Sequence, residues 1–174
     1  GTIDSLYIIG NSSLTTCEVQ SICNYLTSPN GSVDIYGNAS GCNSVQDIAN
    51  NCGITLPCLP YGNYYLASQD DIDGFQADFP GCTDLVGNLR ISGFDITNLN
   101  GLNVISSIEG YLDISSTFLL SDLTGLSSLR FVRSGLIIYN NKLLISLSGL
   151  DVLDSIGGTL SIYDNDSLTS LTGL

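Results

Sequence analysis

The clearest pattern in the chain is a short alternation of apolar and polar residues that returns about every 24 residues. It begins at Leu89, Leu112, Leu136 and Leu160, so the starts lie 23, 24 and 24 residues apart. Each copy reads L-x-I, a polar bend and then L-x-G-L, with further apolar residues after it. Apolar residues at every second position predict a short strand with its leucine and isoleucine facing a core. Because one copy is too short to bury its own apolar side chains, we expect neighbouring copies to stack.

The glycine of each L-x-G-L bend recurs with the same spacing, at Gly101, Gly125, Gly149 and Gly173. We expect it to supply either a positive φ or a close approach between two backbone segments. No segment of these copies shows helical periodicity over ten residues. The repeats therefore predict a mostly β fold, a solenoid of strands and bends.

The first 52 residues carry two more strand signatures, "LYIIGN" from Leu6 and "VDIYGN" from Val33. Two helical segments accompany them, residues 16–26 with Thr16 as the expected N-cap and residues 43–52. We interpret residues 1–52 as the last coil or coils and the C-terminal cap of one solenoid.

Residues 53–60, "GITLPCLP", have the composition of a linker. After them, Ser68 followed by acidic residues predicts the start of a helix. The helix should end before Pro80 and Gly81. We interpret residues 61–174 as the N-terminal cap and first coils of the next solenoid, which would continue into a neighbouring copy.

A C-terminal cap that precedes an N-terminal cap suggests one frame of a tandem array. If Leu6 follows Leu160 with the spacing of 24, the next Leu6 falls at position 184, and the period is 184 − 6 = 178 residues. Four residues would then separate Leu174 from Gly1 of the next copy. The alternative is a fragment whose two halves belong to unequal neighbours.

Six cysteines, an even number, suggest disulfides and an oxidising compartment. A metal site is less favoured because the chain has no histidine and no C-x-x-C pair. Cys17, Cys23, Cys42 and Cys52 surround the two helices of the first segment and allow three pairings. We prefer Cys17 with Cys42 and Cys23 with Cys52. A bridge between Cys58 and Cys82 would bracket the third helix.

The charge of the chain argues against several classes of partner. Seventeen acidic residues face four basic ones, which gives a net charge of −13. Such a surface cannot replace the counterions of a nucleic acid, and anionic membranes are excluded for the same reason. No run of 18 apolar residues is present, so we expect no membrane insertion. Any export signal would have been removed or would lie outside these residues.

The repeat segments and the cap segments of the chain resemble those of a known family. The stretches "LRISGFDITNLNGL", "SIGGTLSIYDNDSLTSLTGL" and "YYLASQDDIDGFQADFPGCT" are similar to the receptor-L-domain-like, leucine-rich solenoids of large bacterial surface proteins, as is "CEVQSICNYLTSPNGSVDIYGNASGCNSVQDIANNC". Those proteins are often exported by type IX secretion. The resemblance implies a right-handed β-solenoid with short helical, disulfide-bonded caps, display outside the cell, and a role in adhesion or structure.

The sixth position of the repeat holds an asparagine in four copies, Asn11, Asn38, Asn141 and Asn165. We predict a structural ladder, in which each amide satisfies backbone groups at the turn between coils. Ligand binding is the less favoured alternative. Phe94 and Thr117 replace the asparagine in the earlier copies.

A possible contact surface comes from tyrosines at or near the outward-facing fourth position, Tyr7, Tyr36, Tyr139 and Tyr163. An outward aromatic stripe suits sugar rings or another protein module. The alternative is that like residues on neighbouring strands stack on one another and stabilise the sheet without a partner.

No cofactor is expected. The acidic stretches "SQDDID" and "YDNDS" leave calcium as an alternative, but neither has the spacing of a known calcium loop. Asp-Ser-apolar triplets at Ser5, Ser155 and Ser167 are candidate O-glycosylation sites by the family resemblance.

An enzyme is not expected, because the chain has no histidine and only two glutamates, Glu18 and Glu109. The sequence predicts a non-enzymatic repeat module of a long cell-surface adhesin or filament. Its partners would be neighbouring copies of itself, a surface glycan or another surface protein. The alternative is a glycan-binding accessory module of a larger secreted enzyme.

Overall fold

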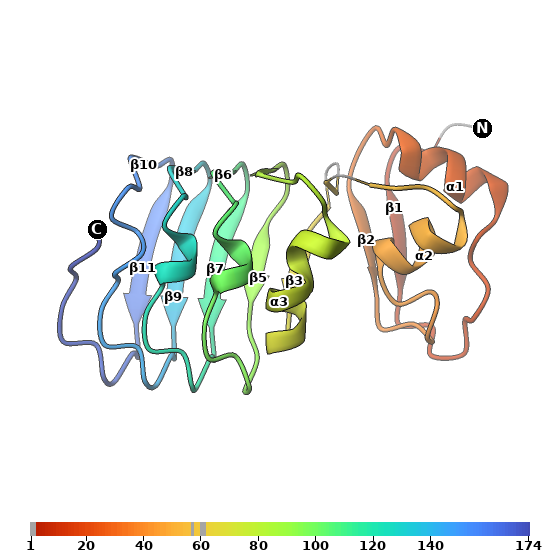
Figure 1. The fold of residues 1–174 in the computed structure, drawn as a ribbon. Helices are drawn as coiled ribbons and strands as arrows, with labels where there is room; N and C mark the ends of the chain where they lie inside the picture. The colour runs from red at the N-terminus through yellow and green to blue at the C-terminus, as the bar shows by residue number, and fades with distance from the viewer. Residues whose placement is uncertain (1–2, 57, 60–61) are drawn as a thin grey trace. The chain divides into compact units, whose positions relative to one another are not determined.

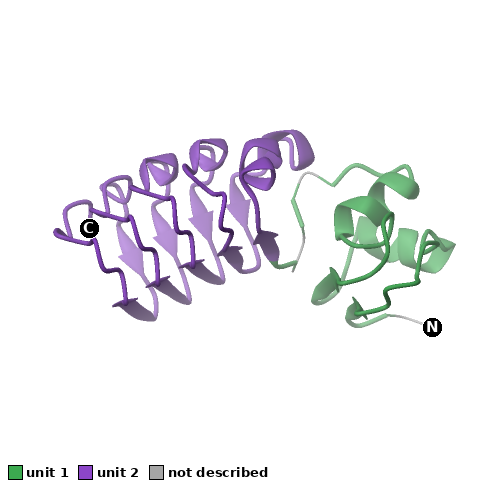
Figure 2. Ribbon diagram, turned by 90° about the horizontal axis from the view of Figure 1, so that it is seen from below, with its two compact units in different colours: residues 1–63 green, residues 64–174 purple. Residues whose placement is uncertain are grey.

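The computed structural model describes residues 3–56, 58–59 and 62–174. These residues form two compact units, Gly1–Asn63 and Tyr64–Leu174 (Figure 2). Each unit is described by itself. The roles predicted for residues 1–52, 53–60 and 61–174 within a longer array stay predictions.

The first unit combines a small parallel sheet with two helices. Its elements are β1 (Leu6–Ile9), α1 (Gln20–Thr27), β2 (Val33–Tyr36) and α2 (Val45–Asn51) (Figure 1). β1 pairs in parallel with β2, so that Leu6 lies opposite Val33 and Ile9 opposite Tyr36. Leu26, Ile48 and Ala49 supply fully buried side chains from the two helices.

The expected N-cap at Thr16 is wrong, since α1 begins only after Val19, whose side chain caps no backbone group. The segment before it is held in another way, because the backbone N–H of Cys17 donates to a carboxylate oxygen of Glu18 at 3.0 Å. α2 starts from Ser44 with a complete capping box to Asp47.

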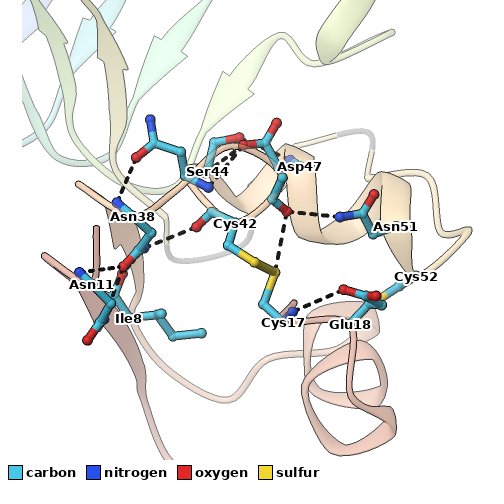
Figure 3. The surroundings of a disulfide bond; sticks show 12 residues. Ile8, Asn11, Cys17, Glu18, Asn38, Cys42, Ser44, Asp47, Asn51 and Cys52 are labelled. Atoms are coloured by element: carbon cyan, nitrogen blue, oxygen red, sulfur yellow. Dashed lines mark hydrogen bonds between the residues drawn. A yellow bond between two sulfur atoms is a disulfide. The ribbon is translucent and has the colours of Figure 1, made fainter. Parts of the chain in front are cut away.

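Two disulfides lie within the first unit, Cys17–Cys42 and Cys23–Cys52 (Figure 3). These two bridges match the preferred pairing among the three that the sequence allows. Cys58 and Cys82 are disulfide-bonded as well, so the disulfides expected from the even cysteine count are confirmed. Cys17 and Cys42 stand in segments outside the helices, while the second bridge ties α1 to the residue after α2.

The second unit is built from two parallel sheets. The five-stranded sheet has the order β11-β9-β7-β5-β3 and the four-stranded sheet the order β10-β8-β6-β4. The strands of the first are β3 (Tyr64–Leu66), β5 (Leu89–Ile91), β7 (Tyr111–Ser115), β9 (Gly135–Tyr139) and β11 (Thr159–Tyr163). Those of the second are β4 (Asp84–Leu85), β6 (Ser107–Ile108), β8 (Phe131–Val132) and β10 (Ser155–Ile156).

The spacing of the L-x-I motif becomes the register of the five-stranded sheet. Leu112 lies opposite Leu89 on one side and Leu136 on the other, and Leu160 continues the row on β11. The isoleucine two residues later follows the same register. The leucine and isoleucine of β5, β7 and β9 are completely buried, as the alternation predicts.

α3 (Gln69–Asp78) and two 3₁₀ helices, η1 (Asn100–Leu102) and η2 (Thr124–Leu126), complete the second unit. Ser68 caps α3 and shares a capping box with Asp71, as predicted, and acidic residues occupy the first turn. Figures 1 and 2 show α3 and the short helical turns on one side of the five-stranded sheet. None of the helices described in residues 64–174 lies on the other, outer face of that sheet.

The glycines of the L-x-G-L bends are sites of close backbone approach. A Cβ atom at Gly125 would lie 2.0 Å from the carbonyl oxygen of Leu99, and one at Gly149 would lie 2.0 Å from that of Leu123. Gly149 and Gly173 also have positive φ, at 111° and 109°. Gly125, Gly149 and Gly173 therefore let one turn of chain pack closely on the previous one, and Gly101 lets its turn pack on Ile72 of α3.

The expected fold class, a mostly β right-handed β-solenoid with helical, disulfide-bonded caps, is wrong. The structure is α/β, with parallel sheets that are open and not closed. The disulfides are not helical caps, since Cys17 and Cys42 join segments outside the helices. The L-x-I pattern predicts strands and their spacing, but it carries no information about the elements that cover them.

Candidate functional site

The outer face of the five-stranded sheet presents one row of side chains across all its strands. Parallel pairing sets these residues in the order Tyr65, Arg90, Asp113, Ile137 and Ser161. They alternate with the buried leucines and isoleucines of the same strands, so they point away from the core. The row brings an aromatic ring, a cation, a carboxylate and an apolar side chain together.

Two adjoining hollows mark the part of this face nearest β3. One, of about 310 Å³, is lined by Tyr65, Asn88, Leu89, Arg90, Tyr111, Asp113 and Ile137. The other, of about 230 Å³, is lined by Tyr65, Leu66, Ala67, Arg90 and Ser92. They share Tyr65 and Arg90, so these two side chains stand between them. We call the residues that line the two hollows the sheet-face site.

Tyr65 and Tyr111 supply the aromatic surface of the sheet-face site. Half of each side chain is open to solvent, 51% for Tyr65 and 50% for Tyr111. Gly135, the neighbour of Tyr111 on β9, leaves room for the ring, because a Cβ atom there would lie 3.1 Å from Cε1 of Tyr111. Two exposed aromatic rings at one hollow are typical of a recognition surface.

Arg90 and Asp113 place opposite charges at the centre of the site. Nε of Arg90 lies 3.6 Å from a carboxylate oxygen of Asp113. Oδ1 of Asp113 is buried and finds no hydrogen-bond partner within the described part of the chain. An exposed ion pair of this kind contributes little to stability. The guanidinium N–H groups of Arg90 and Oδ2 of Asp113, the carboxylate oxygen on the side of Arg90, can instead bind hydroxyl groups of a ligand.

The tyrosines predicted as a contact surface are divided between the two units. Tyr7 and Tyr36 stand on β1 and β2 of the first unit and are 60% and 46% exposed. Tyr139 and Tyr163 stand on β9 and β11 of the second unit, where their rings stack with centroids 4.5 Å apart. This stacking is the alternative that the sequence leaves open for them, and their role as a contact surface stays a prediction.

Sequence reasoning missed Tyr65 and Tyr111. Tyr65 occupies the outward position of "YYL", between buried Tyr64 and Leu66, so the alternation could have identified it. Tyr111 precedes its L-x-I motif by one residue and lies outside the repeat consensus. Only the register of the sheet brings the two rings to the same hollow.

The asparagines of the second unit bond from one turn of chain to the next. Oδ1 of Asn141, a fully buried residue, accepts hydrogen bonds from the backbone N–H of Thr117 at 3.1 Å and from its hydroxyl at 2.7 Å. The backbone N–H of Asn141 in turn donates to Oδ1 of Asn165 at 2.9 Å. The side-chain amide of Asn141 also donates to the carbonyl of Ile114. These bonds satisfy backbone groups at the bends.

The first unit repeats the arrangement with one pair. The backbone N–H of Asn11 donates to Oδ1 of Asn38 at 3.0 Å, and Nδ2 of Asn38 donates to the carbonyl of Ile8 at 2.7 Å (Figure 3). The predicted asparagines thus occupy equivalent positions in two separate ladders.

The two acidic stretches considered for calcium have other partners. Oδ2 of Asp71 accepts from the backbone N–H groups of Ala67 and Ser68, and a carboxylate oxygen of Asp166 lies 2.8 Å from Nζ of Lys142. Within residues 3–56, 58–59 and 62–174, no group of three or more acidic or cysteine side chains is arranged to hold a metal ion.

Hydroxyl groups lower the pKa of two other aspartates. The pKa of Asp84 is held down mainly by the Ser107 hydroxyl, with further hydrogen bonds from Ser106 and Thr83. The Thr124 side chain and backbone N–H lower the pKa of Asp122 in the same way. Asp84 thereby links β4 to the segment that begins β6, Asp122 caps the turn at Thr124, and both carboxylates are ionised at neutral pH.

The three candidate O-glycosylation sites lie at accessible positions. Ser5 and Ser155 are exposed, and Ser167 is half-buried with its hydroxyl donating to the carbonyl of Lys142 at 2.7 Å. Glycosylation of these residues stays a prediction.

Comparison with known proteins agrees with this architecture. The family model of the receptor L domain matches residues 81–173, which is more than half of the chain. The chain belongs to the receptor L domain family. Neither the curated proteins nor the solved structures gave a match. In the described part of the chain, no helix has the length and apolar character needed to cross a bilayer.

Receptor L domains are non-catalytic ligand-binding modules. Together with the disulfides, membership of this family is consistent with an extracellular or secreted ligand-binding module. The matched residues include β5, β7, β9 and β11, so they contain most of the five-stranded sheet and its outer face.

Proposed function

We propose that the chain is a non-enzymatic, extracellular module that binds a surface glycan through the sheet-face site. The observation that carries the proposal is the pair of exposed rings, Tyr65 and Tyr111, at one hollow with Arg90 and Asp113 between the strands that bear them.

The chemistry of the site fits a sugar ring better than a charged polymer. The C–H faces of a pyranose pack on aromatic rings, and its hydroxyls both donate and accept hydrogen bonds. Arg90 offers donors, Asp113 offers an acceptor and Asn88 offers both. The net charge of −13 disfavours polyanionic ligands, so we expect a neutral glycan.

We place this module in a large bacterial surface protein of the adhesin or filament type, exported by type IX secretion. The support is the resemblance of its repeat and cap segments to such proteins. In that setting a weak glycan site gains strength when several copies act together. Calcium and O-glycans at the predicted serines are additions that this proposal does not require.

The test is binding of the 174-residue chain to an array of immobilised neutral and acidic oligosaccharides, followed by calorimetry with the neutral oligosaccharide that binds best. Tyr65→Ala and Tyr111→Ala should each weaken binding about tenfold, because each removes one stacking ring. Phe131→Ala is the matched control, since Phe131 is a similarly exposed aromatic residue on β8 of the other sheet. Its binding should equal that of the wild type.

The alternative, an accessory module of a larger secreted enzyme, would use the same sheet-face site. The array distinguishes the two, because an accessory module should prefer a degradable polysaccharide over cell-surface glycans. Absence of binding to every oligosaccharide, or equal loss in Phe131→Ala, would contradict a glycan site on this face.

A further inference from the structure

Ile137 is the one aliphatic residue in the row on the outer face of the five-stranded sheet. The middle position of the L-x-I motif holds a polar residue in the other three copies, at Arg90, Asp113 and Ser161. Ile137 is half-buried and lines the larger hollow of the sheet-face site. Since this position points away from the core, packing of the core does not require an isoleucine there.

Asp113 places a hydrogen-bond acceptor next to Ile137. The two residues lie opposite each other on β7 and β9, and both line the same hollow. Neighbouring strands are about 4.8 Å apart, so the carboxylate and the apolar side chain stand side by side. The Asp113 side chain is 28% exposed while its Oδ1 is buried, which leaves Oδ2 for a ligand.

The acetamido group of an N-acetylated sugar presents the complementary pair of groups. Its amide is planar and trans, so the N–H and the methyl lie on one edge of the amide and the carbonyl oxygen lies on the opposite edge. The N–H can therefore donate to Oδ2 of Asp113 while the methyl packs on Ile137. A sugar hydroxyl could also donate to Asp113, but it would leave Ile137 without an apolar contact.

Tyr111 stands at the right separation to hold the ring that bears this group. It lies two residues before Asp113 on β7, so both side chains point to the outer face. Two residues of a strand span about 6.6 Å, which is close to the reach of an acetamido group from the centre of a pyranose ring. A sugar ring stacked on Tyr111 can thus direct its acetamido group toward Asp113 and Ile137.

We propose that the sheet-face site recognises N-acetylated hexosamines through their acetamido group. This inference rests on the proposed glycan site and adds the class of sugar that the site takes. The sugar ring stacks on Tyr111, the amide N–H donates to Oδ2 of Asp113, and the methyl packs on Ile137. Arg90 lies on the other side of Asp113 in the row and donates to hydroxyls of the glycan.

Two matched pairs of ligands test the proposal by NMR titration of the 174-residue chain. Triacetylchitotriose and cellotriose are neutral β-1,4-linked trimers that differ only in the group at C2. The methyl β-glycosides of N-acetylgalactosamine and galactose differ in the same way. In at least one pair the acetylated member should bind about tenfold more tightly, because it adds an amide N–H and a methyl group. The pair that shows this preference distinguishes glucosamine-type from galactosamine-type glycans.

Ile137→Thr tests the contact with the methyl group. Threonine is also β-branched and suits a strand, so the sheet should be retained. The variant should bind the acetylated ligand about three- to fivefold more weakly and bind its unacetylated partner as the wild type does. Ile145→Thr is the matched control, since Ile145 is 54% exposed but lies in the bend after β9. It should bind both ligands as the wild type does.

Saturation-transfer NMR gives a second readout of the same contact. The acetyl methyl protons should receive strong saturation from the wild-type chain and less from Ile137→Thr. Saturation confined to the ring protons would overturn the inference, as would equal loss of binding in Ile137→Thr and Ile145→Thr. Binding with no preference for the acetylated member of either pair would overturn the inference and leave the glycan site in place. Failure of every sugar to bind would overturn the inference and the proposed function together.

Discussion

Single glycines determine how closely successive turns of the second unit approach one another. Gly125, Gly149 and Gly173 each face a backbone carbonyl of the previous turn, and Gly101 faces the carbonyl of Ile72 in α3, at distances that no side chain tolerates. Their recurrence in the sequence predicts either a positive φ or a close approach of two backbone segments. Close approach holds at all four, and positive φ applies to Gly149 and Gly173.

Gly125→Ala should therefore destabilise the chain by about 2–3 kcal/mol, the cost of forcing a tightly packed segment apart. Urea unfolding measures the free energy. Gly74→Ala is the control, because Gly74 lies inside α3, and the nearest atom to an added Cβ is a side-chain oxygen at 3.5 Å. Alanine there should stabilise the helix by about 0.5–1 kcal/mol. Equal effects of the two changes would refute the role given to Gly125.

The role of the asparagines at the sixth position of the repeat can be predicted from the sequence. The recurrence of Asn141 and Asn165 at one position predicts hydrogen bonds at a bend, because buried backbone groups need partners. The sheet-face site is different. No recurrence links Tyr65 to Tyr111, and the two rings meet only because β3, β5 and β7 pair in a particular register.

At the scale of elements, the carboxylate of Asp84 joins β4 to β6 through hydrogen bonds. Asp84 accepts hydrogen bonds from the hydroxyls of Ser107 at 2.6 Å and Ser106 at 2.8 Å, which belong to the following turn of chain. These bonds lower the pKa of Asp84 in the folded protein. A lowered folded pKa stabilises the fold above the unfolded pKa of about 4, and this stabilisation is lost as the pH falls through the folded value.

Asp84→Asn should thus be less stable than the wild type at pH 7, and the difference should shrink below about pH 4. Thermal unfolding of both proteins between pH 7 and pH 2.5 provides the measurement. Asp78→Asn, at the end of α3, is a control without these hydroxyl partners. A wild-type advantage that persists undiminished at pH 2.5 would be inconsistent with the ionised form of Asp84 as its source.

The sequence predicts some elements well and others poorly. Ser68 with Asp71 identifies the start of α3, because the capping box is a local interaction encoded within four residues. The sequence misplaces the start of α1 at Thr16, since the segment before Val19 is held by the Cys17–Cys42 bridge and by the bond from the Cys17 N–H to Glu18. The predicted fold class, a mostly β solenoid, is wrong because the periodicity of strands does not determine how helices cover a sheet.

At the scale of the whole molecule, the chain consists of two compact units and belongs to the receptor L domain family. That family and the disulfides are consistent with an extracellular ligand-binding module. Within residues 64–174, α3 and the short helical turns lie on one face of the five-stranded sheet, and the sheet-face site lies on the other (Figure 2).

The most direct test of the proposed function is an NMR titration of the ¹⁵N-labelled chain with the neutral oligosaccharide that binds best on the array. The account predicts that amide shifts change in β3, β5 and β7, with Tyr65, Arg90 and Tyr111 among the residues most affected. Shifts confined to the first unit, or to the four-stranded sheet, would contradict a glycan site on the outer face of the five-stranded sheet.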